Sequence, residues 1–472
     1  MAKGAGITDD DRLEQLRRDY GSTWVSTTDP EDPYNWPSHR KIIIGTVFSF
    51  GQLVPIMSAS MIAAALDDIS HDLKISASIT QITLSSYFLG MAFAPFLIAA
   101  MSEMYGRKRV WIACNAWYIL WNALCPVGNS APLMIVGRFM TGAGASVGVT
   151  LNGPVMADMY GKSERGRSLA IVTLLPYIGP ALGPIVGGVI TQFIHWSWVF
   201  WIMSLTNAAI VLLGLIFVRE SYTPVLLRRK AATDSDPSQI RRTTKSLQNR
   251  LGSYLLRPFR ILFHRPAIWP ISLITTISFA TYSLMLSTYA TLWIDRYGQS
   301  ELIGSLHYLS IALGSTIAGQ VGARVMDWSY RYLSRRSGRD GTPELRLPYT
   351  SSGMIFMPVG LLLCGWSAEY TLTWAVVDVG AILFTLGSFV ATQGIMAYQL
   401  DEFGEYGASA GAASRLLSYS LAFVLPIFAP DLYGTLGYGW GNSVLALATL
   451  VLGLPVFAML LVCGEKLESI GR

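Results

Sequence analysis

Residues 82–109, ITLSSYFLGMAFAPFLIAAMSEMYGRKR, contain the pattern that decides the fold: twenty residues without charge, followed by a short basic loop. About 20 mostly apolar residues are enough for a helix to cross a bilayer. Lys and Arg concentrate in the loops on the cytoplasmic side of a membrane. This stretch therefore predicts a membrane-spanning helix that ends at the cytoplasmic face.

The composition indicates that the whole chain, like this stretch, is apolar and poor in charge. The 472 residues are 52% hydrophobic and only 14% charged, whereas soluble domains carry about 25% charge. This excludes a soluble globular protein, and it also excludes a disordered chain, which needs low hydrophobicity and high net charge. Twelve apolar segments are predicted spans: 42–66, 82–101, 110–128, 133–157, 168–191, 197–218, 267–294, 302–326, 350–366, 372–396, 407–430 and 441–463.

The basic residues predict which loops between these segments are cytoplasmic. With the N-terminus inside, all 35 Lys and Arg residues fall on the cytoplasmic side except Lys74, Arg138, Arg296 and Arg415. Both termini are therefore expected in the cytoplasm, and the net charge of +5 is attributed to topology, without a nucleic-acid partner. The predicted parts are an N-terminal tail with an interfacial segment (1–41), a six-helix half (42–218), a central cytoplasmic loop (219–266), a second six-helix half (267–463) and a C-terminal tail (464–472).

Signals for an enzyme, a metal or a cofactor are absent from the sequence. Cys114, Cys125, Cys364 and Cys463 lie in apolar runs without a CxxC pair, which disfavours a zinc site or a disulfide scaffold. The five histidines are scattered, with no HExxH motif. The segment 160–163 imitates a phosphate loop, but Met156 stands where its first glycine is needed. We expect no cofactor, no metal and no enzymatic activity.

The loop at 102–109 suggests a contact at the cytoplasmic side. Gly106 permits a tight turn. Glu103 could face the positive N-terminus of a neighbouring helix, and the arginines of the loop, Arg107 among them, could pair with Asp158 at the end of the fourth span. The alternative is a basic loop that only sets topology.

Two further motifs lie inside spans. Arg138 lies about six residues into the fourth span, and a charge at that depth usually faces a partner or a water-filled cavity, unless it reaches back to the interface. The fifth span should bend at its prolines and pack closely against another helix, unless it is an ordinary small-residue interface. Its motif consists of Gly179, Gly183, Pro184, Gly187 and Gly188.

Together these motifs give a resemblance to the major facilitator superfamily, and in particular to the fungal twelve-span drug:proton antiporters. The matching segments are 32–37 (DPYNWP), 102–107 (SEMYGR), 138–144 (RFMTGAG), 183–188 (GPIVGG), 220–229 (ESYTPVLLRR) and 439–443 (GWGNS). The resemblance covers about residues 30–465. The sequence departs from the family pattern at Ala94, Met104 and Ser197, and the first two could weaken a cytoplasmic lock.

The resemblance implies an all-α polytopic membrane protein, with twelve transmembrane helices in two pseudo-symmetric six-helix halves. It implies that Glu103, Arg107 and Asp158 form a cytoplasmic gate and that Arg138 takes part in proton coupling. The glycines from Gly179 to Gly188 would shape a helix contact that favours export.

Asp378 is the deep acid of the second half. It lies about six residues into the tenth span, as Arg138 does in the fourth, so the two charges are predicted to face each other across a central cavity. Asp378 would then be a proton carrier or a substrate contact, unless the pair is structural. Residues that could line the cavity, or else make helix-packing hydrogen bonds, are Tyr87, Asn152, Tyr177, Gln192, Gln393 and Tyr398.

The predicted function is proton-coupled export of small amphipathic organic compounds, such as drugs, toxins or secondary metabolites, by alternating access. Its partners would be the organic substrate, protons and the lipid bilayer. The alternatives are proton-coupled uptake of a nutrient, an organic acid or a polyamine and, from another class, a membrane receptor or sensor. A monomer in the plasma membrane is expected, with the vacuolar membrane as the alternative address.

Overall fold

The computed structural model describes residues 22–26, 28–160, 165–234, 260–337, 342–403 and 407–469, together with Leu13, Glu14 and Arg17. Throughout this described part the regular structure is helical, with no strand. The predicted all-α fold is therefore confirmed.

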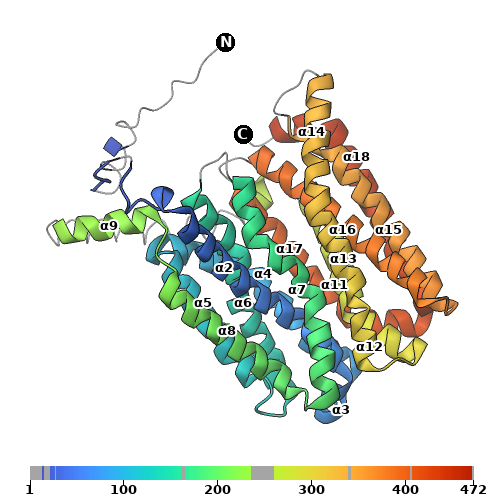
Figure 1. Ribbon diagram of the computed structural model, residues 1–472. Helices are drawn as coiled ribbons and strands as arrows, with labels where there is room; N and C mark the ends of the chain where they lie inside the picture. The colour runs from blue at the N-terminus through green and yellow to red at the C-terminus, as the bar shows by residue number, and fades with distance from the viewer. Residues whose placement is uncertain are drawn as a thin grey trace.

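The first half of the chain forms six long helices. The first of them, α2, runs on through the 3₁₀ turn η2 into the short α3. A further helix, α9, lies crosswise at the edge of the bundle (Figure 1). The bounds are α2 (Ser38–Met61), η2 (Ile62–Ala65), α3 (Leu66–Leu73), α4 (Ala77–Tyr105), α5 (Arg107–Leu124), α6 (Ala131–Met159), α7 (Arg165–Phe193), α8 (Ser197–Phe217) and α9 (Thr223–Asp234).

The second half repeats this plan with more interruptions. Its eighth span is divided into α12, α13 and α14, and single π-helical turns, η4 and η5, interrupt the seventh and eighth spans. The bounds are α11 (Ile268–Thr291), η4 (Leu292–Arg296), α12 (Glu301–Leu306), α13 (Tyr308–Ile317), η5 (Ala318–Gly322), α14 (Ala323–Ser337), η6 (Pro343–Arg346), α15 (Leu347–Glu369), α16 (Trp374–Phe403), α17 (Gly407–Ile427) and α18 (Ala429–Ser469).

The long helices give the bundle two ends. We call the end that carries α9 the α9 face and the opposite end, which carries α3 and α12, the α3 face (Figure 1). The short turn η1 (Pro33–Asn35) leads into α2 at the α9 face, and α4 ends and α5 begins there as well.

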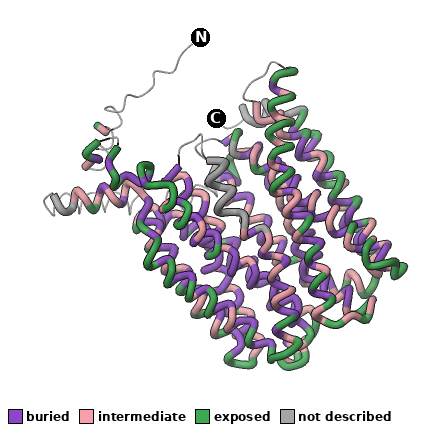
Figure 2. The backbone as a smooth tube through the Cα atoms, viewed as in Figure 1, coloured by how far each residue is buried: buried purple, intermediate pink, exposed green. Residues whose placement is uncertain are grey.

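Ten of the described helices are long and apolar enough to cross a membrane. The predicted third and fifth spans fall on α5 and α7, which are helical but do not count among the ten. The helix α5 opens with three basic residues, and α7 contributes the shorter apolar stretch Ile178–Phe193. Large apolar side chains such as Leu205 and Ile216 are exposed on the outer surface, while buried residues fill the space between helices (Figure 2). This is the pattern of a multi-pass membrane protein.

The main contacts between the two halves join α4 with α17 and α7 with α12 and α13, and η2 makes a smaller contact with α11. At the first contact Phe88 of α4 stacks on Tyr419 of α17, with 6.4 Å between ring centroids, and Phe279 of α11 packs edge-on against both. At the second contact, near the α3 face, the Thr191 hydroxyl donates to the Glu301 carboxylate over 2.8 Å. The aromatic cluster of Phe88, Phe279 and Tyr419 thus lies where the halves meet.

Candidate functional site

Asp378 lies in the first two turns of α16, close to the α3 face, and is bound by two other helices of its own half. The Tyr289 hydroxyl on α11 donates to Asp378 Oδ1 over 2.8 Å, and His307 Nδ1 lies 2.8 Å from Oδ2. Both side chains are largely buried, at 15% exposure for Asp378 and 10% for His307. We call Asp378, His307 and Tyr289 the Asp378 triad.

His307 lies at the break between α12 and α13, and it is held on two further sides. The Trp293 ring stacks on the imidazole with 3.5 Å between centroids, and Nε2 lies 3.0 Å from Gln299 Oε1. With the amide in this orientation both ring nitrogens face acceptors, which suits a protonated imidazolium. Turning the Gln299 amide would offer a donor to the neutral ring, so the site can satisfy either protonation state.

A cavity of about 410 Å³ opens beside the Asp378 triad. Asp378, His307 and Ser310 supply its polar wall, and Trp374 and Leu309 belong to its apolar wall. Histidine is the side chain whose unperturbed pKa lies within the physiological range. An acid and an imidazole in contact, beside open space near one end of the bundle, form an arrangement that can take up and release a proton.

Arg138 lies in α6 without exposure to solvent. Its guanidinium group lies over the Tyr87 ring, 4.4 Å from the centroid, and Tyr87 in turn donates its hydroxyl to the Pro55 carbonyl over 2.7 Å. None of the three guanidinium nitrogens has a hydrogen-bond partner within the described part of the chain. A buried cation held only by rings is costly, which is typical of a functional position.

The alternative of a direct structural pair between Arg138 and Asp378 is not formed. No hydrogen bond or ion pair joins them among the described residues, because Asp378 is bound by His307 and Tyr289 and Arg138 packs on Tyr87. Position along counterpart spans sets the depth of a residue in the membrane. It does not fix the direction in which the side chain points around the helix axis.

At the α9 face the structure brings Arg107 and Asp158 together. Arg107 Nε donates to Asp158 Oδ2 over 3.2 Å, and Nη1 donates to the Ser102 hydroxyl over 2.6 Å. The Tyr222 ring covers the guanidinium group at 4.2 Å. Both charged side chains are largely buried, so this ion pair is shielded from solvent.

Glu220 occupies the position that the sequence suggested for Glu103. Its carboxylate accepts from the backbone N–H groups of Arg107 over 2.7 Å and Lys108 over 3.3 Å, at the positive N-terminus of α5. Gly106 has φ of +99°, and a side chain there would collide with this carboxylate. Glu103 is instead half-buried on the last turn of α4. We call Arg107, Asp158 and Glu220 the α9-face latch; the only sequence signal for Glu220 was its place in the 220–229 marker segment.

The glycine motif of the fifth span forms the predicted close helix contact. Gly179, Gly183 and Gly187 face α2, where an added Cβ would lie 2.9 Å from Ile56 Cγ2 at Gly179 and 2.5 Å from the Met61 carbonyl at Gly187. Gly188 points the other way, toward Ser305 of α12 in the second half. The helix continues through Pro184 to Phe193, so one face of α7 packs within its half and another packs between halves.

The predicted cavity residues that the structure describes each contact neighbouring helices. Asn152 donates to Gln52 of α2, and the Tyr349 hydroxyl donates to Gln393 over 3.4 Å. Tyr398 is buried in an apolar core of the second half. Tyr87, already described under Arg138, and these three residues make intramolecular contacts of the helix-packing kind. The side chain of Tyr177 lies outside the described residues.

Comparison with known proteins gives consistent matches. The family model described as Major Facilitator Superfamily matches residues 48–426. A protein of Aspergillus flavus named "Probable efflux pump mfs2" is 36% identical over 87% of this chain and 99% of its own length. An efflux pump of Penicillium aethiopicum is 33% identical over 91% of this chain and 87% of its own length. The xylose transporter of E. coli, in a partially occluded inward-open conformation, superimposes with a TM-score of 0.66 at 14% identity, over 90% of this chain and 97% of its own.

Proposed function

Because this chain belongs to the Major Facilitator Superfamily and is a multi-pass secondary transporter, we propose that it exports small amphipathic organic compounds in exchange for protons. The Asp378 triad is the observation that carries the proton coupling. It joins an acid and an imidazole at 2.8 Å, beside a cavity near one end of the bundle. A change in the charge of the triad, reached by a proton from the α3 side, would alter its hold on α11 and α12.

The contacts between the halves support alternating access. The Thr191–Glu301 hydrogen bond joins α7 to α12 near the α3 face. The α9-face latch, in contrast, lies entirely within the first half and its following segment. In the proposed cycle the halves rock against each other, so that the α7–α12 contact opens when the α9 side closes. The latch of Arg107, Asp158 and Glu220 would act as the gate of the α9 side.

Export is favoured over uptake by the relatives that are named efflux pumps. Arg138 would couple the proton to substrate movement, since a buried cation without a carboxylate partner can accept one transiently. The substrate class, an amphipathic and largely neutral or anionic molecule, fits the aromatic surfaces of Phe88, Phe279 and Tyr419 where the halves meet. We further propose a plasma-membrane monomer whose α9 face is cytoplasmic.

The test uses the full chain expressed in yeast cells loaded with Nile red, a neutral amphipathic dye, or with fluorescein, an anionic one. Cells with the parent chain should retain less dye, and a proton uncoupler should restore retention. Asp378→Asn should abolish both effects. Asp401→Asn is the matched control, because Asp401 lies on the same helix and pairs with Arg346 at the opposite end. Lower dye content after uncoupling would indicate uptake and contradict the proposal.

A further inference from the structure

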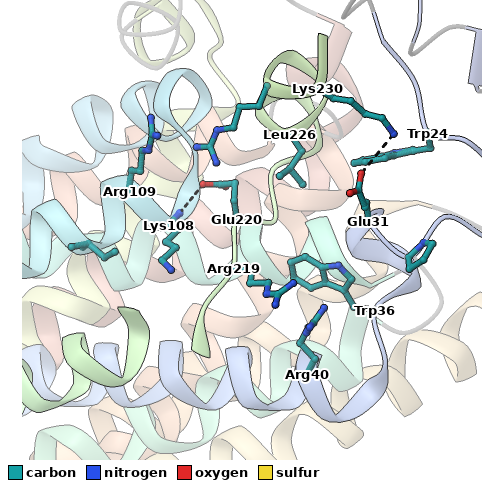
Figure 3. Close-up of a pocket in the computed structure, with 13 residues that line it drawn as sticks. Trp24, Glu31, Trp36, Arg40, Lys108, Arg109, Arg219, Glu220, Leu226 and Lys230 are labelled. Atoms are coloured by element: carbon teal, nitrogen blue, oxygen red, sulfur yellow. Dashed lines mark hydrogen bonds and ion pairs between the residues drawn. The ribbon is translucent and has the colours of Figure 1, made fainter. Parts of the chain in front are cut away.

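A second cavity, of about 830 Å³, lies at the α9 face between the N-terminal segment, the first turns of α5 and the helix α9 (Figure 3). It is remote from the Asp378 triad, which lies close to the α3 face. Its most prominent feature is charge, since six basic side chains line it: Arg40, Lys108, Arg109, Arg219, Arg229 and Lys230. We call it the basic pocket.

The basic pocket has fewer acids than cations in its lining, and Lys230 also lies 3.9 Å from Asp29 beside it. Glu31 lies 3.6 Å from Lys230, and Glu220 is occupied by the backbone N–H groups of α5. Six cations against two carboxylates give the lining side chains a formal charge of +4. Within the part of the chain that the structure describes, Arg40, Arg109 and Arg219 have no carboxylate partner. The basic pocket is therefore suited to an anion with several negative charges.

Two tryptophans form walls of the same pocket. Trp24 lies 5.7 Å from the Lys230 ammonium, and Trp36 lies 5.7 Å from the Arg40 guanidinium, both measured to the ring centroid. Trp36 directly precedes the first long helix, at the level where tryptophans mark the membrane–water interface. The crosswise α9 contributes Leu226, Arg229 and Lys230 at the same level. The basic pocket thus lies at the depth of lipid headgroups.

An apolar surface leads from the basic pocket into the membrane region. Leu212, Leu213 and Ile216 of α8 are exposed directly before Arg219 in the chain. Ile112 of α5 belongs to the lining itself. A ligand in the pocket can therefore place charged groups among the cations and apolar chains along α8. A free anion would use only the first of these surfaces.

We propose that the basic pocket binds the phosphorylated headgroup of an anionic membrane lipid. A phosphate group takes several charge-assisted hydrogen bonds, and basic pockets at the cytoplasmic edge of membrane helices are suited to such headgroups. Arg40 of α2, Arg109 of α5 and Arg219, which follows α8, line the pocket and would supply positive charge to the bound headgroup. The bound lipid would hold the N-terminal segment and α9 against the helix whose N-terminus Glu220 caps.

The test measures lipid binding to the purified full chain by native mass spectrometry. The probes are phosphatidylinositol 4-phosphate, phosphatidylcholine as the neutral lipid, and inositol 1,4-bisphosphate as the headgroup without its chains. Each removed cation should weaken binding of the phosphorylated lipid about fivefold, so the double variant Arg109→Ala/Arg219→Ala should lose roughly 25-fold. Replacing the same two residues with Lys should retain most of the binding, because the charge remains.

The matched control is Arg335→Ala/Arg336→Ala, which removes two exposed cations from α14 outside the pocket. It should bind the phosphorylated lipid as the parent does. Equal losses in the two double variants would contradict the proposal, because they would indicate a general charge effect. Inositol 1,4-bisphosphate that binds as tightly as the lipid would overturn the assignment to a lipid. Both double variants alter exposed side chains, so each should unfold at the same temperature as the parent, which a thermal melt checks.

Discussion

The fourth and tenth spans carry the deep charges of the two halves, and the two are held in opposite ways. Asp378 has a base and a hydroxyl within 2.8 Å and lies beside a cavity. Arg138 is fully buried, rests on rings and has no hydrogen-bond partner in the described structure. A charged group with hydrogen-bond partners can change its protonation without disrupting the fold. A buried charge without such partners destabilises the folded state. In the proposed mechanism the second half would bind the proton and the first half would respond to it.

The largest expected effect is at Arg138. Arg138→Leu should raise the free energy of unfolding by about 1–4 kcal/mol, because a costly buried charge is removed, while transport is lost. Thermal unfolding in detergent and dye retention in cells measure the two effects. If the variant were less stable and still transported dye, Arg138 would be an ordinary structural residue and the contrast with Asp378 would fail.

The next effect is expected in two glycine variants of α7, one that disturbs packing within a half and one that disturbs packing between the halves. Gly183→Ala should cost about 1–3 kcal/mol of stability, because its Cβ would meet Ser60 and the Met57 carbonyl on α2. Gly188→Ala faces Ser305 in the other half, so it should chiefly shift the equilibrium between the open and closed states. Thermal unfolding and accessibility of the α3 face to a cysteine reagent distinguish the two.

The control for both glycine variants is Gly153→Ala on α6. An added Cβ there meets nothing within 4 Å. This substitution should be neutral or raise stability by about 0.5–1 kcal/mol, as Ala is the better helix residue. A loss as large as that of Gly183→Ala would show that close contact with α2 is not the cause.

A smaller energetic effect is expected within the Asp378 triad, and a double-mutant cycle tests it. Asp378→Asn and His307→Gln should each weaken binding between α12 and α16, and together they should show a coupling energy of about 0.5–3 kcal/mol. Dye export should be lost in Asp378→Asn and reduced in His307→Gln. Strictly additive effects would mean that the 2.8 Å contact does not link the two residues energetically.

The smallest expected effect lies outside the bundle, in the N-terminal segment that only the first half carries. Burial alone would raise the pKa of Asp29, but hydrogen bonds from the Glu31 and Val25 backbone and the charge of Lys230 hold it below its usual value. The resulting stabilisation is complete above the unfolded pKa of about 3.9 and is lost as the pH falls through the folded pKa. Lys230→Ala should cost about 0.2–1 kcal/mol.

Hydrogen exchange of the Val25 and Glu31 amides measures this effect. Protection should be constant between pH 5 and 8, once the intrinsic exchange rate is corrected, and should fall in acid. Asp29→Asn should remove the acid-dependent part. Protection that falls near neutral pH would point to a different group.

The sequence predicted well how deep a residue lies in the membrane and predicted poorly in which direction its side chain points around the helix axis. Apolar length located the long helices, and the spacing of small residues correctly predicted the close contact of α7, because Gly179, Gly183 and Gly187 share one helix face. The Arg107–Asp158 contact was also anticipated, since both residues lie at helix ends on one side. These predictions need only the position of a residue along its helix.

The remaining contacts depend on helix rotation and on breaks in the helices. His307 binds Asp378 from the one-residue junction between α12 and α13, and no residue pattern at 306–308 predicted that junction. Glu220 caps α5 from 113 residues away along the chain. The basic pocket likewise gathers cations from four separate segments, and the sequence alone attributed these charges to topology. Such groupings arise from tertiary packing, which a single sequence does not display.

The aromatic cluster of Phe88, Phe279 and Tyr419 should affect how the transport rate depends on temperature. These rings pack across the two halves, so any motion that parts the halves there exposes aromatic surface. Newly exposed apolar surface raises the heat capacity of the opened state. The enthalpy of opening then changes with temperature, and a plot of the logarithm of the transport rate against reciprocal temperature should be curved when opening limits the rate.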